Sequence, residues 1–130
     1  MDIINHIEIG VADVAASRRF YEAVLAPLGL SLVVSVDPAR TARGTPRYGF
    51  GRDGYPVFWI HGEEDTGRPI HVAFTAVTRA QVDAVHAAAL ATGGTDTGAP
   101  GIRERYHPRY YAAFVLDPDG NNLEAVCQSA

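Results

Sequence analysis

The chain has 130 residues, of which 47% are hydrophobic, and its 15 acidic and 11 basic side chains give a formal net charge of −4 at pH 7. This length and apolar content suit a single domain with its own core, and the scattered arginines in a net acidic chain exclude the charge pattern of a nucleic-acid binder. The single cysteine, Cys127, excludes an internal disulfide, and the absence of a leader-like segment or a run of roughly 20 apolar residues predicts a cytoplasmic protein without a membrane partner.

The first half of the sequence predicts a strand, a helix and three more strands. Residues 3–11 alternate between an apolar face and a polar face that carries His6 and Glu8, as in a half-buried strand. Asp13 is placed to cap a helix over 14–26. On this helix we expect three polar residues to face water: Ser17, Arg18 and Arg19. Strand-like runs follow at 30–36, 47–51 and 55–61.

The second half predicts the same order of elements. A strand over 69–76 is followed by Thr78 and Gln81, which have the spacing of a capping box and therefore mark the start of a helix. Gly93 and Gly94 end that helix. Strands are predicted near 95–98, at 110–116 and at 121–127, and a tight hairpin turn over 117–120 joins the last two.

The two halves therefore form a tandem repeat. The predicted fold is α+β, a single domain of two βαβββ modules at about 1–62 and 69–128, whose strands form a curved mixed sheet. Glu124 lies 53 positions after His71 (124 − 71 = 53), and Trp59 lies 53 positions after His6 (6 + 53 = 59). Trp59 is thus the repeat equivalent of Glu124.

Three of these equivalent positions carry metal-binding groups. If a pseudo-twofold axis relates the halves, their first and last strands converge, and His6, His71 and Glu124 meet with Trp59 at the fourth corner. Two imidazoles and one carboxylate match the triad that holds iron(II), and they also suit manganese, nickel or zinc. The alternative is that each histidine is an ordinary polar residue at a strand end.

Three segments resemble the recurring signatures of one superfamily. Residues 5–9 together with Phe20 and Tyr21, residues 70–74 and residues 114–124 are similar to the motifs of vicinal-oxygen-chelate proteins, which include glyoxalases, bleomycin-resistance proteins and extradiol dioxygenases. The resemblance extends over essentially the whole chain. It implies paired βαβββ modules whose sheet wraps a divalent metal ion and a small-molecule substrate, usually in a homodimer that builds the site within one chain or from two.

Two positions depart from the better-known members. Glyoxalase I-like enzymes usually have a glutamate where this chain has Trp59, and tryptophan neither binds metal nor carries a proton. Extradiol dioxygenases have a tyrosine where this chain has Phe114. The resemblance therefore implies a glyoxalase-like, metal-dependent enzyme of lyase, isomerase or dioxygenase type that acts on a small oxygen-rich or aromatic substrate. The alternative is a metal-free binding protein of the drug-sequestering kind.

Further residues are candidates for proton transfer and substrate binding. Lyase or isomerase chemistry needs a proton carrier, for which Glu8, His61 and His107 are available, although Glu8 is equally suited to pair with an arginine and His61 to cap a strand end. Aromatic and basic groups near the metal hairpin suit a flat, anionic substrate, and the alternative is an exposed loop or a dimer contact. The pocket candidates are Trp59, Arg103, Tyr106, Tyr110 and Tyr111.

Overall fold

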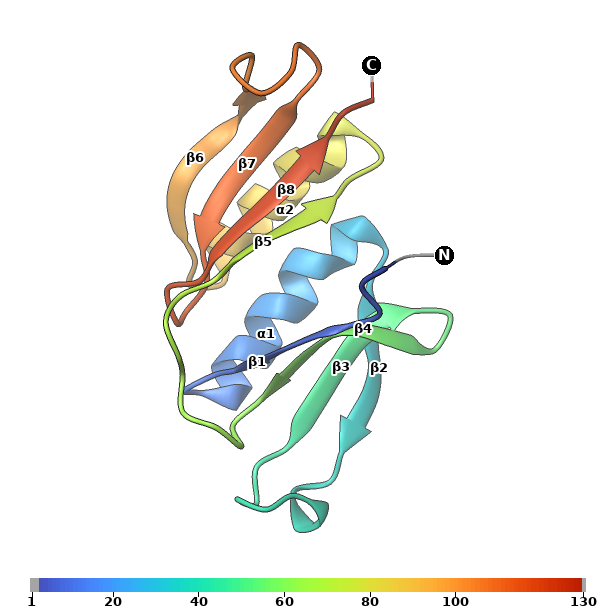
Figure 1. Cartoon of the computed structure of the whole chain (residues 1–130), viewed down its shortest axis with the longest axis vertical. Coiled ribbons are helices and arrows are strands. Elements are labelled where there is room, and N and C mark those ends of the chain that lie inside the picture. Colours follow the sequence, from blue (N-terminus) through green and yellow to red (C-terminus); the bar gives the residue numbers. More distant parts are fainter. Residues whose placement is uncertain (1–2, 130) are drawn as a thin grey trace.

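The computed structural model describes residues 3–129 and contains two modules with the same order of elements (Figure 1). The first module consists of β1 (Ile7–Gly10), α1 (Val14–Leu25), the short helix η1 (Ala26–Leu28), β2 (Ser31–Val36), the short helix η2 (Pro38–Arg40), β3 (Arg47–Arg52) and β4 (Tyr55–His61). The second consists of β5 (His71–Thr75), α2 (Arg79–Ala91), β6 (Thr95–Ile102), β7 (Tyr111–Leu116) and β8 (Asn122–Cys127). The predicted α+β tandem is confirmed, and no helix among these elements is long and apolar enough to cross a membrane.

Each module forms a four-stranded mixed sheet. The strand orders are β1-β4-β3-β2 and β5-β8-β7-β6, with the first and last strands of each module parallel. Glu8 pairs with Trp59 in the first sheet and Ala73 with Glu124 in the second, so both pairs are related by the same offset (73 − 8 = 65 and 124 − 59 = 65). Trp59 therefore occupies, in the first module, the place that Glu124 occupies in the second.

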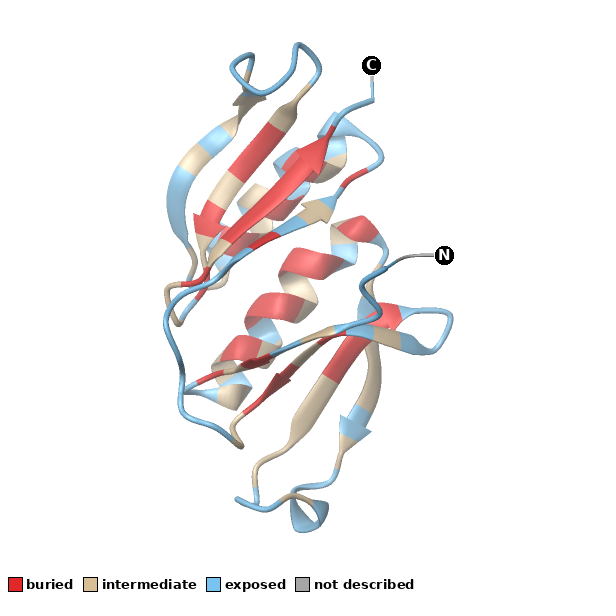
Figure 2. Ribbon diagram, viewed as in Figure 1, coloured by how far each residue is buried: buried red, intermediate tan, exposed pale blue. Residues whose placement is uncertain are grey.

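The first strands of the two sheets lie on the sides that face each other. In Figure 1, β1 and β5 lie toward the middle of the molecule and run in opposite directions, while β2 and β6 lie at the outer ends. Helices α1 and α2 pack against each other, and one hydrophobic cluster includes residues of both modules. Figure 2 shows that the buried positions follow α1, β7 and β8, whereas β6 and the connecting loops are more exposed.

The helix starts follow the predicted capping chemistry. The Asp13 carboxylate accepts a hydrogen bond from the amide of Ala16, and Thr78 and Gln81 form both bonds of a capping box. The expectation that Ser17 faces water is wrong, because this residue is only 1% exposed. The reason is tertiary: the second module covers this part of α1, a contact that helical periodicity does not reveal.

The part of the second module that covers α1 is the turn between β7 and β8. The Asp117 carboxylate accepts bonds from the amides of Asp119 and Asn121 at 2.9 and 2.8 Å, and from the Asn121 side chain at 2.9 Å. It also accepts a bond from the hydroxyl of Tyr21 in α1, and Asp119 accepts one from the amide of Ala12. Burial, followed by the charge of Asp117, raises the pKa of Tyr21 well above its usual value. This turn therefore joins the modules through buried polar groups.

Two strands differ most from their predicted extents. Strand β1 begins at Ile7, so His6 precedes it; Asn5 instead bonds to His6 and to the hydroxyl of Tyr55 at 2.8 and 2.7 Å. Strand β6 runs to Ile102, well beyond the predicted 95–98. Its pairing with β7 shifts register around Gly98 and again before Gly101, which breaks the alternation that a regular strand would show.

Candidate functional site

The open face of the second sheet brings His71 and Glu124 together. His71 begins β5, Glu124 lies on the adjacent β8, and the His71 Nε2 and Glu124 Oε1 atoms are 3.0 Å apart. Glu124 is only 5% exposed, and its other carboxylate oxygen accepts a hydrogen bond from the hydroxyl of Tyr110. Burial of a carboxylate is costly unless it is partnered, and here His71 and Tyr110 partner it from two sides.

Aromatic rings surround this pair. Phe114 pairs with Glu124 across β7 and β8, and its ring stacks on the imidazole of His71 with 6.2 Å between centroids. Tyr106 meets Tyr110 edge to face at 5.1 Å. Burial, followed by the hydrogen bond to Glu124, raises the pKa of Tyr110 to about 12. Its hydroxyl is therefore protonated at neutral pH and donates to the carboxylate.

The other predicted pocket residues divide between two faces. Arg103 lies with Tyr106 and Phe114 around a pocket of about 270 Å³ beside the His71–Glu124 pair. Tyr111 points the other way, toward α2, where its hydroxyl donates to Asp83 at 2.6 Å, and it does not line this pocket. Tyr110, in the loop before β7, therefore reaches the site, whereas Tyr111, the first residue of the strand, lies on the opposite face.

Trp59 lies on the first sheet with a different set of neighbours. Its ring packs against Gly49, where an added Cβ would lie 3.1 Å from the indole. The Arg47 guanidinium lies 6.0 Å from the ring centroid and pairs with Glu8 at 2.8 Å. Two roles were open for Glu8, proton transfer or pairing with an arginine. In the structure it pairs with Arg47.

The remaining proton-carrier candidates lie in local contacts. His61 is buried and its Nδ1 atom accepts the amide of Glu63 at 3.2 Å, as expected for a histidine that caps a strand end. His107 is exposed in the loop before β7, and its Nδ1 atom accepts the amide of Arg109 at 3.0 Å. Neither histidine hydrogen-bonds to His71 or Glu124 in the described chain.

His6 does not join the other two predicted ligands. It is exposed, and within residues 3–129 no group of three histidine, cysteine or acidic side chains is placed to hold a metal ion. Strands β1 and β5 run in opposite directions (Figure 1). The start of β1, which follows His6, and the start of β5, which is His71, therefore lie at opposite sides of the molecule. Within the described chain the three predicted ligands therefore do not meet, whereas His71 and Glu124 do.

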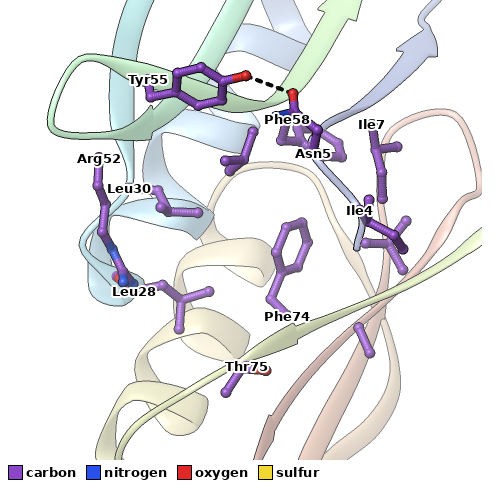
Figure 3. Close-up of a pocket in the computed structure, with 13 residues that line it drawn as sticks. Ile4, Asn5, Ile7, Leu28, Leu30, Arg52, Tyr55, Phe58, Phe74 and Thr75 are labelled. Atoms are coloured by element: carbon purple, nitrogen blue, oxygen red, sulfur yellow. Dashed lines mark hydrogen bonds between the residues drawn. The ribbon is translucent and has the colours of Figure 1, made fainter. Parts of the chain in front are cut away.

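A larger groove lies between the two modules. Its volume is about 520 Å³, and Figure 3 shows Phe74 of β5 projecting toward Leu28 and Leu30 of the first module. The Tyr55–Asn5 hydrogen bond crosses one end of this groove. Sequence reasoning missed this feature, since its walls come from short apolar segments far apart in the chain and no motif marks them.

Two βαβββ modules, with His71 and Glu124 paired on the sheet of the second, place the chain in the class of proteins built from paired modules of this kind. The chain belongs to the Glyoxalase/Bleomycin resistance protein/Dioxygenase superfamily, whose family model matches residues 3–125. No curated protein matches the chain.

Solved structures agree with this assignment. The chain is 28% identical to a glyoxalase/bleomycin resistance protein from Albidiferax ferrireducens T118, with a TM-score of 0.74 over 97% of this chain and 98% of that one. Glyoxalase I from Zea mays is 22% identical, with a TM-score of 0.69 over 95% of this chain and 45% of the maize chain. A glyoxylase/bleomycin resistance protein/dioxygenase domain from Frankia sp. EAN1pec is 17% identical, with a TM-score of 0.70 over 98% of both chains. The last two likenesses concern the fold alone.

Proposed function

We propose that the protein is a glyoxalase-like, metal-dependent enzyme of lyase, isomerase or dioxygenase type, acting on a small oxygen-rich or aromatic substrate. The observation that carries this proposal is the buried Glu124 carboxylate beside the His71 imidazole on an open sheet face. An imidazole nitrogen and a carboxylate oxygen fit iron(II), nickel, manganese or zinc. The pair therefore supplies part of a divalent-metal site.

The residues around the pair have distinct roles in this proposal. A divalent ion held by His71 and Glu124 would supply Lewis acidity toward a substrate oxygen. His71 and Glu124 hold the ion, and Tyr110 fixes the Glu124 carboxylate from behind through its hydrogen bond. Phe114 orients the His71 ring by stacking on it. Trp59 offers only an N–H donor, so the fourth corner of the site provides no proton acceptor.

The third ligand in this proposal is His6 from a second copy of the chain. Its exposed position on the described chain leaves it free of the tertiary packing that would tie it to one module. Apolar side chains around the adjacent groove are also uncovered: Ile4 is 67% exposed, Tyr55 53% and Val57 39%. Exposed apolar surface of this kind is typical of an interface, and it supports a homodimer in which the site is shared between chains.

Metal analysis tests the proposal. Protein purified without a chelator or a histidine tag should contain a divalent ion, and both His71→Ala and Glu124→Ala should lose it. Trp59→Ala is the matched control on the equivalent strand and should retain the ion, because its side chain is not a ligand. Protein that contains no ion and binds none of iron(II), nickel, manganese or zinc would contradict the proposal, as would retention by both ligand variants.

A metal-free binding protein is the second candidate. Two observations favour it: only two predicted ligands meet within the described chain, and the apolar groove of about 520 Å³ is large enough for an organic molecule. In that case Asn5, Arg52 and Thr75, which line this groove, act as polar contacts to a sequestered ligand. A metal-free protein whose melting temperature rises with an apolar ligand would favour this candidate over the enzyme.

A further inference from the structure

Two arginines stack on aromatic rings at the rim of the small pocket beside His71 and Glu124. The Arg103 guanidinium lies 5.4 Å from the centroid of Phe114, and that of Arg105 lies 4.9 Å from the centroid of Tyr106. All four side chains line the same pocket. Stacking of the planar guanidinium on an aromatic face holds the positive charge beside the ring.

The position of Arg103 depends on two glycines of β6. Its Nη1 and Nη2 atoms donate to the carbonyl oxygens of Gly101 and Ala99 at 2.9 and 2.7 Å. A Cβ at Gly98 would lie 2.9 Å from the Phe114 ring and 3.1 Å from Arg103 Nη2, and one at Gly101 would lie 3.2 Å from Arg103 Nη1. Glycine at both positions therefore lets the guanidinium and the ring lie against the strand backbone.

Both guanidinium groups retain unused donors. Among the described residues, no carboxylate lies within ion-pair distance of Arg103 or Arg105. A guanidinium has five N–H groups, so two bonds to backbone carbonyls leave Arg103 with three. In a chain with a net charge of −4, two adjacent cations without an acidic partner form a local site for an anion.

The pocket is connected to the His71–Glu124 pair. Phe114 contacts the Arg103 guanidinium and also stacks on His71, so one ring lies against both the cation and the candidate ligand. Tyr106 contacts Tyr110, whose hydroxyl holds Glu124. We propose that Arg103 and Arg105, with Phe114 and Tyr106, form the subsite for the carboxylate of a flat, anionic substrate such as an aromatic or α,β-unsaturated acid. This deepens the proposed function and rests on it for the reaction.

Binding of three probes tests the subsite: benzoate, neutral benzamide of the same shape, and cyclohexanecarboxylate, which has the charge without the flat ring. Calorimetric titration should give a Kd for benzoate about tenfold lower than for benzamide, because the amide loses the charge-assisted hydrogen bonds. Cyclohexanecarboxylate should bind more weakly than benzoate. In spectra of the ¹⁵N-labelled protein, benzoate should shift the amide signals of Gly98, Gly101 and Phe114.

Three variants test whether benzoate binds at this subsite. Arg103→Gln should weaken benzoate binding at least about tenfold, and Gly98→Ala should also weaken it by displacing Phe114 and Arg103. Arg109→Gln is the matched control, since it removes the same charge from an exposed residue of the same loop and should change the Kd less than about twofold. Equal binding of benzoate and benzamide, equal losses in the two arginine variants, or shifts confined to the groove around Phe74 would each overturn the subsite.

Metal content of the same samples separates this proposal from the proposed function. Arg103→Gln should keep the metal content of the parent protein, because Arg103 bonds to neither His71 nor Glu124. Selective benzoate binding by a protein without metal would overturn the enzyme and leave the subsite in place. Bound metal without selectivity for benzoate would overturn the subsite and leave the proposed enzyme in place.

Discussion

At the scale of single residues, Tyr110 shows how a loop side chain can set the properties of a strand residue. Its hydroxyl donates to the buried carboxylate of Glu124, whose other oxygen faces His71. Tyr110→Phe removes that donor, so the carboxylate gains freedom to turn away from His71. We expect metal affinity to fall by roughly 10- to 100-fold, the usual effect of losing a partner of a ligand. Competition with a coloured chelator measures the metal affinity of the variant and the parent protein.

Tyr106→Phe provides the control for this experiment. Tyr106 contacts the ring of Tyr110, but its hydroxyl bonds to Arg105 and not to Glu124. This variant should therefore retain the metal affinity of the parent protein. Equal affinity in Tyr110→Phe and the parent would show that the hydrogen bond does not position the carboxylate.

The candidate site was only partly predictable at this scale. The 53-residue separations correctly made Trp59 the equivalent of Glu124, because parallel pairing has the same register in both modules. Strand alternation also placed His71 and Glu124 on one face. Two features were missed: the hydrogen bond from Tyr110 to Glu124, and the packing of Arg103 against Gly98 and Gly101. Both depend on how an irregular loop and a bulged strand fold back on the sheet.

At the scale of elements, the contact between α1 and the β7–β8 turn makes stability depend on pH. The pKa of Tyr21 is raised in the folded state, so folding favours its protonated form. The resulting stabilisation is fully present below the unfolded pKa of about 10 and is lost as the pH rises toward the higher folded pKa. We therefore expect the free energy of unfolding, measured with urea, to decrease above about pH 10.

Tyr21→Phe separates this contribution from those of other tyrosines. It leaves Asp117 buried with one donor fewer and should cost about 1–3 kcal/mol at neutral pH. It should also reduce the loss of stability at alkaline pH. Tyr55→Phe, which removes an exposed hydroxyl bonded to Asn5, should follow the parent protein. An alkaline loss of the same size in Tyr21→Phe and the parent would exclude Tyr21 as its source.

Prediction of the elements succeeded where local chemistry decides. The capping groups of Asp13 and Thr78 identified both helix starts, because these bonds form within one turn of the chain. Prediction failed where another module decides, as at Ser17, which the second module buries. Local patterns describe each module by itself, whereas the packing of one module on the other requires the tertiary structure.

At the scale of the whole molecule, the separation of His6 from His71 leads to a test of where a complete metal site is built. If His6 of one copy completes the site formed by His71 and Glu124 of another, His6→Ala and His71→Ala proteins should each lack metal. Unfolding and refolding them together should restore binding, because each mixed dimer contains one site with all three ligands intact. Random mixing makes about half of the dimers mixed, so about a quarter of the parent metal content should return. A site built within one chain predicts no recovery, since every chain in the mixture then lacks one of its own ligands. Mixing His71→Ala with Glu124→Ala is the control, because these two residues meet within one chain and neither arrangement allows them to complement each other.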